Sequence, residues 1–365
     1  MHVGIFMPYL HGGGAEFVAR RWIWDLHARG HRITIYLYHP QQPPVALPEN
    51  VVVHRFKPVW PSLRHLLLPS WLHRRVSRDQ PDVLLSLLTY SNVVALLTRA
   101  LFRHENLPLV VSERNMPSLE NSDVGLRDRL TCWLARRLYR RAAGVLAISH
   151  PVAGDLVSAF RVPAARLYVV PNPIISEHQL EAAPLTETPR SLHIVFIGRL
   201  VMQKRPDLFL AVLSAMTEGG HDVRGTIIGD GPLREQTEQE TDQLGLDVSF
   251  AGWQEPWWEA ISDIDCVLLT ARFEGLANVL VEAAAANIPS VACSRALGVA
   301  DAIVPGVTGE LAMTDRPSDY AEAVWRACSR TPHERNGLQG WLDHFSTERS
   351  TTSLLAALRA ASEPD

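Results

Sequence analysis

Short, continuous apolar runs alternate with helical patterns along the whole chain, and this alternation constrains the fold more than any other feature. The first half contains the strand candidates VGIFMPYL, ITIYLY, VVVHRF, PDVLLSLL, PLVVSE and GVLAIS. The second half contains SLHIVFIG, VRGTIIG, VSFAG, DCVLLT and PSVAC, with helices expected at about 204–218, 232–244, 256–262, 277–287 and 318–330. Uninterrupted apolar strands are typical of parallel sheets that helices cover on both faces. The pattern predicts an α/β fold with doubly wound, Rossmann-like domains.

The alternation breaks once, over the polar and proline-rich segment PNPIISEHQLEAAPLTETPR. We interpret this segment as an interdomain linker, and the length of 365 residues supports two domains. Ligands of parallel sheets bind outside the carboxyl ends of the strands, so we expect the site in a central cleft that both domains face. The expected organisation is a first domain at 1–170, the linker at 171–190, a second domain at 191–345, and a C-terminal helix within 346–365 that packs back on the first domain.

The two halves of the chain carry opposite charge. Residues 1–170 contain 21 Lys and Arg against 11 Asp and Glu, a net charge of +10. Residues 171–365 contain 14 against 28, a net charge of −14. A basic half favours an anionic partner such as a phosphate or an acidic membrane leaflet. Nucleic acid is not expected, because no nucleic-acid recognition motif accompanies the charge.

Three basic segments of the first half also contain Leu and Trp, at 63–78, 95–104 and 133–141. Such helices suit docking on an anionic membrane surface, although core packing of the same apolar side chains explains each segment equally well. No stretch of about 18 uncharged apolar residues is present, so no transmembrane helix is expected. Since MHVGIFMPYL enters a strand pattern directly, we expect a cytoplasmic protein, peripheral on the inner face of the membrane. The four cysteines lack CxxC spacing and are predicted to be reduced thiols.

Two glycine-rich turns follow strand candidates. HGGGAE, with Gly13 and Gly14, lies between the first strand and the first helix, where the backbone can approach a ligand and helix N–H groups face an anion. GDGP, with Gly229 and Gly231, follows VRGTIIG and is a candidate wall of a nucleotide pocket. A purely structural turn explains either motif as well.

Two cations follow the strand SLHIVFIG, namely Arg199 and Lys204. Arginine offers a forked pair of donors and lysine a compact charge, a combination that suits a diphosphate at a strand end. Two solvated surface cations are the alternative.

The segment EGLANVLVEA carries the most informative spacing. Glu274 comes at the end of the strand DCVLLTA, and the N–H groups of Leu276, Ala277 and Asn278 are predicted to open a helix toward a phosphate or a sugar hydroxyl. Glu282 lies about one turn into that helix, where a carboxylate can accept two ribose hydroxyls.

These motifs together resemble the retaining glycosyltransferases of family 4, whose GT-B fold consists of two Rossmann-like domains facing a central cleft. EGLANVLVEA resembles the E-x7-E signature of the family, and GGAE, AIS, VVPNP, GRLVMQK, GDGP, FAG and GVTGEL follow the order of the family's motifs. The resemblance covers nearly the whole chain.

The resemblance implies a role for each candidate residue. Arg199 and Lys204 would hold the donor diphosphate and, with Glu274 on the sugar hydroxyls, form the catalytic set. Trp253 would face the base and Glu282 the ribose. The donor-binding residues implied are Gly13, Gly14, Arg114, Asn115, Gly229, Gly231, Trp253, Gly275, Leu276, Ala277, Asn278 and Glu282.

The resemblance also implies retention of anomeric configuration, with no metal, no cofactor and no assigned protein nucleophile. A donor phosphate oxygen would take the acceptor proton. The chain departs from the family in two places. SERNMP at 112–117 lacks the His that many relatives carry there, so Arg114 or Asn115 is expected to contact the sugar instead, and Arg205 stands where glycine is usual after the motif lysine.

The function expected is transfer of a hexose or N-acetylhexosamine from a nucleotide sugar, with a UDP-sugar favoured, to a glycan or lipid-linked acceptor in cell-envelope polysaccharide synthesis. The alternatives are a small soluble acceptor, or a nucleotide-sugar-binding epimerase or scaffold. Asp263 and Asp265 spell D-x-D, a metal-binding signature of another glycosyltransferase fold. Their place before a strand predicts a turn or capping role instead.

Overall fold

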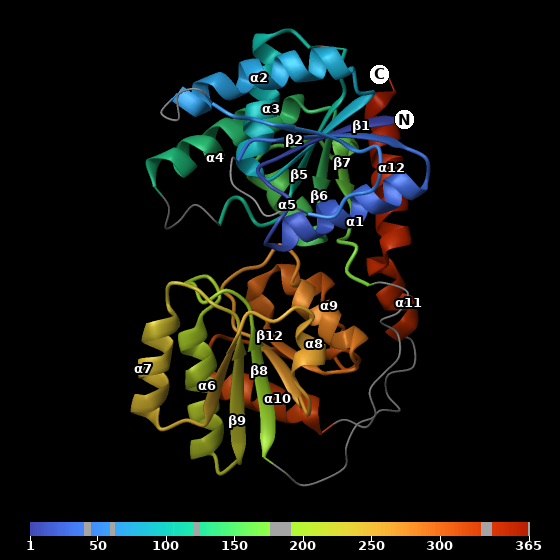
Figure 1. The fold of residues 1–365 in the computed structure, drawn as a ribbon. Coiled ribbons are helices and arrows are strands. Elements are labelled where there is room, and N and C mark those ends of the chain that lie inside the picture. The colour runs from blue at the N-terminus through green and yellow to red at the C-terminus, as the bar shows by residue number, and fades with distance from the viewer. Residues whose placement is uncertain are drawn as a thin grey trace. The chain divides into compact units, whose positions relative to one another are not determined.

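The computed structural model describes residues 1–39, 45–58, 63–104, 106–119, 125–175, 191–329 and 338–363, and it divides into two compact units (Figure 1). Unit 1 comprises Met1–Ile174 and Phe345–Asp365, and unit 2 comprises Ile175–His344. The chain therefore leaves unit 1 once and returns to it. At that crossing the Ile174 N–H donates to the Phe345 carbonyl at 2.9 Å. Most of the predicted linker, residues 176–190, lies outside the described residues.

Unit 1 contains a parallel sheet in the order β3-β2-β1-β4-β5-β6-β7. Its strands are β1 (His2–Met7), β2 (Arg32–Leu37), β3 (Val52–Arg55), β4 (Val83–Leu87), β5 (Leu109–Glu113), β6 (Gly144–Ala147) and β7 (Leu167–Val169). Its helices are α1 (Gly14–Ala28), α2 (Arg64–Asp79), α3 (Thr89–Leu101), α4 (Leu126–Leu138), α5 (His150–Ser158) and α12 (Thr347–Ser362). Gly30 follows α1 with φ +79°, the left-handed conformation that ends a helix at little cost to glycine.

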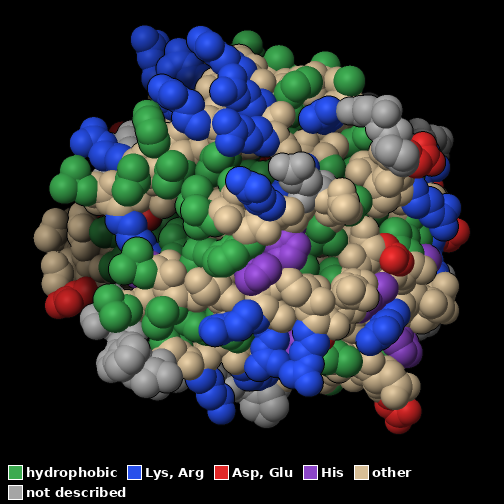
Figure 2. Space-filling model, turned by 90° about the horizontal axis from the view of Figure 1, so that it is seen from above, with side chains coloured by type: hydrophobic (Ala, Val, Ile, Leu, Met, Phe, Trp, Pro, Cys, Tyr) green, Lys and Arg blue, Asp and Glu red, His purple; other side chains and the backbone are tan. Residues whose placement is uncertain are grey.

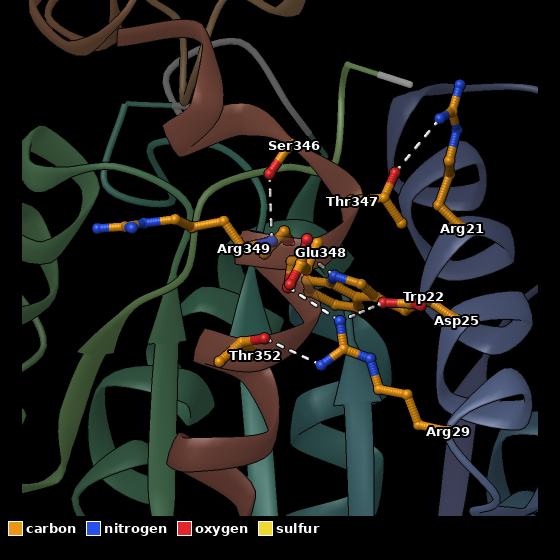
Figure 3. Close-up of polar contacts among 10 residues, drawn as sticks. Arg21, Trp22, Asp25, Arg29, Ser346, Thr347, Glu348, Arg349 and Thr352 are labelled. Carbon is orange, nitrogen blue, oxygen red and sulfur yellow. Dashed lines mark hydrogen bonds and ion pairs between the residues drawn. The ribbon is translucent and has the colours of Figure 1, made fainter. Parts of the chain in front are cut away.

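The C-terminal helix α12 completes the core of unit 1 (Figure 1). Leu354 and Leu358 are fully buried in one apolar cluster with residues of β1, β4 and α1. Polar contacts to α1 fix the position of the helix: Trp22 Nε1 donates to Ser350 Oγ at 2.9 Å, and Arg29 Nη1 to Thr352 Oγ1 at 2.9 Å (Figure 3). Helix α12 is thus an integral layer of unit 1.

Unit 2 contains a second parallel sheet, in the order β10-β9-β8-β11-β12-β13. Its strands are β8 (Leu192–Ile197), β9 (Val223–Ile228), β10 (Val248–Gly252), β11 (Cys266–Leu269), β12 (Ser290–Cys293) and β13 (Gly309–Ala312). Its helices are α6 (Pro206–Glu218), α7 (Arg234–Leu244), α8 (Trp257–Ala260), α9 (Asn278–Ala285), α10 (Pro317–Cys328) and α11 (Leu338–Leu342). A separate apolar cluster, built on β8, β9, β11, α6 and α10, forms its core. The doubly wound α/β prediction is confirmed in both units.

Both sheets begin with the same polar arrangement at their amino-terminal edge. In unit 1, His2 Nε2 lies 2.8 Å from Thr34 Oγ1, and Asp82 accepts the His2 backbone N–H at 2.6 Å. In unit 2, His193 Nε2 lies 2.7 Å from Thr226 Oγ1, and Asp265 accepts the His193 backbone N–H at 2.8 Å. In each case the His is on the first strand, the Thr on the second, and the Asp directly precedes the fourth.

The cysteine prediction is confirmed. All four thiols are free, and Cys132, Cys266 and Cys293 are buried. Among the described residues, no helix combines the length and the apolar character needed to cross a bilayer.

Candidate functional site

The strand order of unit 2 reverses between β8 and β11. Chain segments that leave neighbouring strands at such a switch point diverge and leave a crevice at the carboxyl edge, where ligands of α/β sheets bind. Gly198–Lys204 leaves β8 at this point, and Thr270–Glu274 leaves β11. Four predicted residues therefore belong to this crevice or to the helix that follows it: Arg199, Lys204, Glu274 and Glu282.

An ion pair joins the two segments. Lys204 Nζ lies 2.5 Å from Glu274 Oε1, with only 18% and 9% of the respective side chains exposed. A largely buried pair of this kind fixes both side chains, because loss of either partner leaves an uncompensated charge. The two residues are 70 positions apart in sequence, and the structure brings them into contact.

Further hydrogen bonds hold the two segments in place. Thr270 Oγ1 lies 2.9 Å from the carbonyls of both Lys204 and Arg205. Gln203 Nε2 donates to the Phe273 carbonyl at 2.9 Å, and the Arg272 N–H donates to the Gln203 carbonyl at 2.8 Å. The Lys204 ammonium is consequently positioned by its backbone as well as by its ion pair.

The predicted glycines of unit 2 allow backbone segments to cross. A Cβ on Gly229 would lie 1.9 Å from the Gly198 carbonyl oxygen, and one on Gly231 would lie 2.5 Å from the Leu200 carbonyl oxygen. Gly229 also has φ +150°, which L side chains rarely adopt. These contacts explain why glycine stands at both positions, and the donor-binding role of the pair stays a prediction.

The segment that follows β11 differs from the expectation at one point. Helix α9 begins at Asn278, one residue after the predicted start at about 277, and the Asn278 N–H donates to the Leu276 carbonyl at 3.0 Å. In the part of the chain that the structure describes, the N–H groups of Leu276 and Ala277 donate to no acceptor. The backbone donors that precede α9 are therefore those of an irregular turn, because Gly298 packs against the carbonyls of Glu274 and Gly275 and holds the chain out of the helix.

Glu282 is positioned by a residue that the motifs did not reveal. Trp257 Nε1 donates to Glu282 Oε2 at 2.8 Å, and the Trp257 side chain is buried. Trp253, the tryptophan predicted for the base, is 58% exposed. The pair of tryptophans in PWWEAIS was a usable signal, since a buried indole needs an acceptor for its N–H.

Arg199 is exposed. Among the described residues its guanidinium has no hydrogen-bond or ion-pair partner. It contrasts with Lys204, whose ammonium is already occupied by Glu274.

In unit 1, Gly13 caps the N-terminus of α1 with an extended backbone, and Gly14 is the first residue of the helix. Both are exposed at the carboxyl end of β1. Glu16 in the first turn is buried, although glutamate is seldom fully buried.

Arg114 and Asn115 follow β5. Arg114 Nη1 donates to Asn172 Oδ1 at 2.9 Å, and its guanidinium lies 4.4 Å from the centroid of the Trp22 ring. Its Nε and Nη2 are buried without a partner, and burial lowers the pKa of Arg114 to about 9. Asn115 turns its Oδ1 to the Met116 N–H at 2.9 Å. Arg114 is therefore anchored to unit 1 by Trp22 and Asn172.

Glu113 is a second residue that the motifs did not reveal. The carboxylate is buried at the end of β5 and accepts hydrogen bonds from Thr89, Asn92 and Tyr139. Burial, together with Glu113, raises the pKa of the Tyr139 hydroxyl. A carboxylate with three donors is satisfied and holds β5, α3 and Tyr139 together.

Two sequence families match the chain, one for each half. "Glycosyltransferase Family 4" matches residues 12–178, and "Glycosyl transferases group 1" matches residues 191–330. The chain belongs to glycosyltransferase family 4. Both matches fall on the units that carry the motifs described above.

Two curated proteins illustrate the similarity. The lipopolysaccharide 1,6-galactosyltransferase of Salmonella typhimurium is 30% identical over 210 residues, which cover 55% of this chain and 56% of that protein. The GalNAc-alpha-(1->4)-GalNAc-alpha-(1->3)-diNAcBac-PP-undecaprenol alpha-1,4-N-acetyl-D-galactosaminyltransferase of Campylobacter jejuni is 23% identical over 86% of this chain and 85% of its own length. The match to the Salmonella protein thus spans little more than half of its length.

A solved structure has a similar fold over nearly the full length of the chain. Anabaena Alr3699/HepE in complex with UDP-glucose superposes with a TM-score of 0.76, at 18% identity, over 98% of this chain and 99% of the other. The GT-B fold class is thereby confirmed.

One family departure has a local explanation. Arg205 adopts φ +56°, the left-handed conformation in which the family's usual glycine is favoured. Its guanidinium is held by Asp207 at 2.9 Å, and this partner raises the pKa of Arg205. The turn therefore keeps its backbone shape with arginine in place of glycine.

The D-x-D sequence lies where a turn role predicts it. The Asp265 carboxylate accepts the His193 N–H at the amino-terminal edge of the sheet, and Asp263 contributes its carbonyl 3.2 Å from His193 Nδ1. This edge is opposite the carboxyl ends of the strands. Within the described residues no group of three or more His, Cys, Asp or Glu side chains is arranged to hold a metal.

Proposed function

We propose that the chain is a retaining glycosyltransferase that moves a hexose or N-acetylhexosamine from a UDP-sugar to a glycan or lipid-linked acceptor in cell-envelope polysaccharide synthesis. The observation that carries the proposal is the Lys204–Glu274 pair at the switch point of unit 2. The pair places a cation for a departing diphosphate next to a carboxylate that can accept sugar hydroxyls. The transferase activities for which the Salmonella and Campylobacter relatives are named support the class of reaction.

The leaving diphosphate would be held by three kinds of donor in unit 2. Arg199 offers a guanidinium with no partner among the described residues, and Lys204 offers its ammonium. The N–H groups of Leu276 and Ala277 precede α9 beside Glu274. Donors fixed before the reaction stabilise charge that develops in the transition state, because they need no reorganisation. UDP-glucose in the Anabaena structure supports a nucleoside diphosphate as the carrier.

Glu282 would hold the ribose of the donor. Trp257 occupies Oε2 and fixes the plane of the carboxylate, so the group is a preset acceptor for hydroxyls. Both site carboxylates are thus engaged by a donor of unit 2, Glu274 by Lys204 and Glu282 by Trp257. This favours recognition over acid–base chemistry, and we assign acceptor deprotonation to a donor phosphate oxygen, without metal or cofactor.

Unit 1 would contribute Gly13, Gly14, Arg114 and Asn115 on the donor sugar. The exposed glycines at the start of α1 permit close approach of a ligand to the backbone. Arg114 would act from its position against Trp22 and Asn172.

Helix α4 supports peripheral docking on an anionic membrane. Leu126, Leu130 and Trp133 are spaced along one face and are 84%, 56% and 51% exposed. Five arginines flank this stripe at positions 127, 129, 136, 137 and 140. Figure 2 shows many Lys and Arg and few Asp and Glu side chains on a face of unit 1, with hydrophobic side chains exposed between them. Apolar side chains ringed by cations suit an interfacial helix.

A donor screen tests the transferase proposal. The protein is mixed with UDP-, GDP- and ADP-sugars and nucleotide release is followed for the wild type, Lys204→Ala and Glu274→Ala. Both variants should lose about 100-fold or more in rate. Arg234→Ala, which removes a surface pair with Glu238, is the matched control and should retain full activity. Nucleotide release that both site variants leave unaffected would contradict the site.

Co-sedimentation with liposomes tests the membrane proposal. Vesicles with 30% anionic lipid, at low salt, should bind the wild type and release Trp133→Ser. Trp325→Ser removes an equally exposed tryptophan, 51%, from unit 2 and should bind normally. Full activity on a water-soluble sugar without liposome binding would instead favour a soluble acceptor.

A further inference from the structure

The carboxyl edge of the unit 1 sheet carries a group of side chains that the donor site does not use. The strand order of unit 1 reverses between β1 and β4, so its crevice lies at the ends of these two strands. Helices α2, α3 and α4 all begin at this edge. Each contributes one residue within its first two positions, namely His65, Tyr90 and Arg127.

These three residues are in mutual contact. His65 Nδ1 lies 2.7 Å from Tyr90 Oη and 3.5 Å from Arg127 Nη2. The Arg127 guanidinium covers the Tyr90 ring at 4.8 Å from its centroid. Because a guanidinium can only donate, Nδ1 of His65 is an acceptor and its ring proton belongs on Nε2. The cluster therefore presents a guanidinium and an imidazole N–H.

The cluster has positive charge in excess. Arg64 precedes His65 on α2, and neither Arg64 nor Arg127 has a carboxylate partner in the part of the chain that the structure describes. Burial, then Arg127 and Arg64, lowers the pKa of His65. Burial raises the pKa of Tyr90, and the same two arginines oppose that rise. Two cations act on the same imidazole and the same phenol, and no carboxylate of the described residues pairs with either, which favours an anionic ligand.

Backbone strain marks the same position. Leu88, which joins β4 to α3 directly before Thr89 and Tyr90, adopts φ +76° although it is not glycine. Such conformations cost free energy and persist where the surroundings hold them, commonly at binding sites.

We propose that Arg127, His65, Tyr90 and Arg64 form the subsite for a phosphate or diphosphate group of the acceptor. The assignment rests on the proposed transferase function, and it gives the acceptor a chemistry: a phosphorylated or diphosphate-linked glycan. The guanidinium of Arg127 binds phosphate oxygens and His65 donates from Nε2, while Tyr90 positions both, with its ring under the guanidinium and its hydroxyl on Nδ1 of His65.

Calorimetric titration of the full chain with inorganic pyrophosphate, in the presence of saturating UDP, tests the subsite. The variants are Arg127→Gln and Arg64→Gln, and the matched control is Arg129→Gln, an exposed arginine on the same helix. We expect Arg127→Gln to weaken pyrophosphate binding about tenfold, since it removes a charge-assisted contact, and Arg129→Gln to leave it unchanged. Equal affinity of wild type and Arg127→Gln, or absence of binding by the wild type, would overturn the proposal.

Two further titrations complete the experiment. The first distinguishes a lipid-linked from a soluble phosphorylated acceptor, and the second distinguishes failure of the acceptor subsite from failure of the transferase proposal. Farnesyl diphosphate that binds more tightly than pyrophosphate, with the same dependence on Arg127, assigns the subsite to a lipid-linked diphosphate, whereas equal affinities assign it to a soluble phosphorylated acceptor. UDP titrated alone into wild type and Lys204→Ala measures the donor site. Loss of UDP binding in Arg127→Gln would overturn the assignment to the acceptor, whereas failure of the wild type to bind UDP would count against the transferase proposal alone.

Discussion

The two units are alike at one edge of their sheets and different at the other. At the amino-terminal edge both use the same three residue types in the same places, His2, Thr34 and Asp82 in unit 1 and His193, Thr226 and Asp265 in unit 2. At the carboxyl edge unit 2 has a buried Lys204–Glu274 pair. Unit 1 has the His65–Tyr90–Arg127 cluster, with cations that lack an anionic partner among the described residues.

The difference separates what stabilises a doubly wound unit from what gives it a function. At the amino-terminal edge, an aspartate accepts a backbone N–H of the first strand and a threonine pairs with the buried histidine. Both units use these contacts to stabilise the fold. The carboxyl edge is where the switch points leave room for ligands, so its residues follow the ligand. We therefore expect substitutions at the shared edge to change stability and those at the differing edges to change binding.

The largest expected effect distinguishes the glycines of the two carboxyl edges. Gly229→Ala should destabilise unit 2 by about 3 kcal/mol or more, because the new Cβ would meet the Gly198 carbonyl oxygen at 1.9 Å. Gly13→Ala in unit 1 should cost less than about 1 kcal/mol, because its Cβ would meet only the Glu16 carboxylate at 3.1 Å. Urea unfolding followed by peptide-resolved hydrogen exchange measures both. Comparable losses would show that the two turns are equally constrained.

The second prediction concerns two tryptophans of unit 2. Trp257→Phe removes one donor to Glu282 and so loosens the orientation of that carboxylate, and UDP affinity should fall about tenfold. Trp253→Phe alters an exposed ring and should change affinity by less than about twofold. Calorimetry with UDP is the measurement. The reverse order would assign base recognition to Trp253, as the family resemblance implies.

The third prediction tests the shared edge through pH. Burial lowers the pKa of His2 and of His193 below 6.5, with Arg32 and Arg224 adding to the shift. As pH falls through 6.5 the unfolded chain binds these protons before the folded chain does, so stability present above that pH is lost below it.

Thermal unfolding between pH 7.5 and 5 should therefore show a fall in stability that His2→Gln reduces in unit 1 and His193→Gln in unit 2. His11→Gln, at an exposed position, is the control. A response confined to one unit would break the equivalence of the two edges.

The smallest expected effect concerns the surface contacts between α1 and α12. Arg29→Gln removes contacts to Thr352 and the Glu348 carbonyl of α12, and to Asp25 of α1, that lie near the surface, so unit 1 should lose no more than about 0.5 kcal/mol. Ser350→Ala, which takes the acceptor from the buried Trp22 N–H, should cost about 1–2 kcal/mol. Chemical denaturation of unit 1 compares the two. A larger loss in Arg29→Gln would place the anchor of α12 at the surface.

Most of the fold follows from the sequence, because a long apolar run can be buried only in a covered sheet. Two strands were not predicted. β7 (LYV) has three residues, β13 (GELA) includes a glutamate, and both lie at sheet edges, where fewer apolar residues are required. Helix α9 starts later than its pattern indicates because Gly298 packs against the turn before it, a tertiary contact that no local pattern encodes.

The sequence predicts those residues of the candidate site that belong to recognisable motifs. Lys204 and Glu274 can each be identified from a sequence motif, and their contact follows because both lie at strand ends of one sheet. No motif identifies Trp257, Glu113 or the His65–Tyr90–Arg127 cluster. Their partners come from segments 21 to 62 residues away, and only the three-dimensional arrangement brings them together.

The return of the chain to unit 1 has a consequence for its synthesis. On the ribosome, all of unit 2 is made between Ile174 and Phe345, while unit 1 still lacks the helix that covers Trp22. At about 5–20 residues per second this interval is roughly 10–35 s. The second unit can therefore complete its core first. The amino-terminal half meanwhile waits with an exposed apolar surface, a period in which a chaperone that binds such surfaces would act on unit 1 alone.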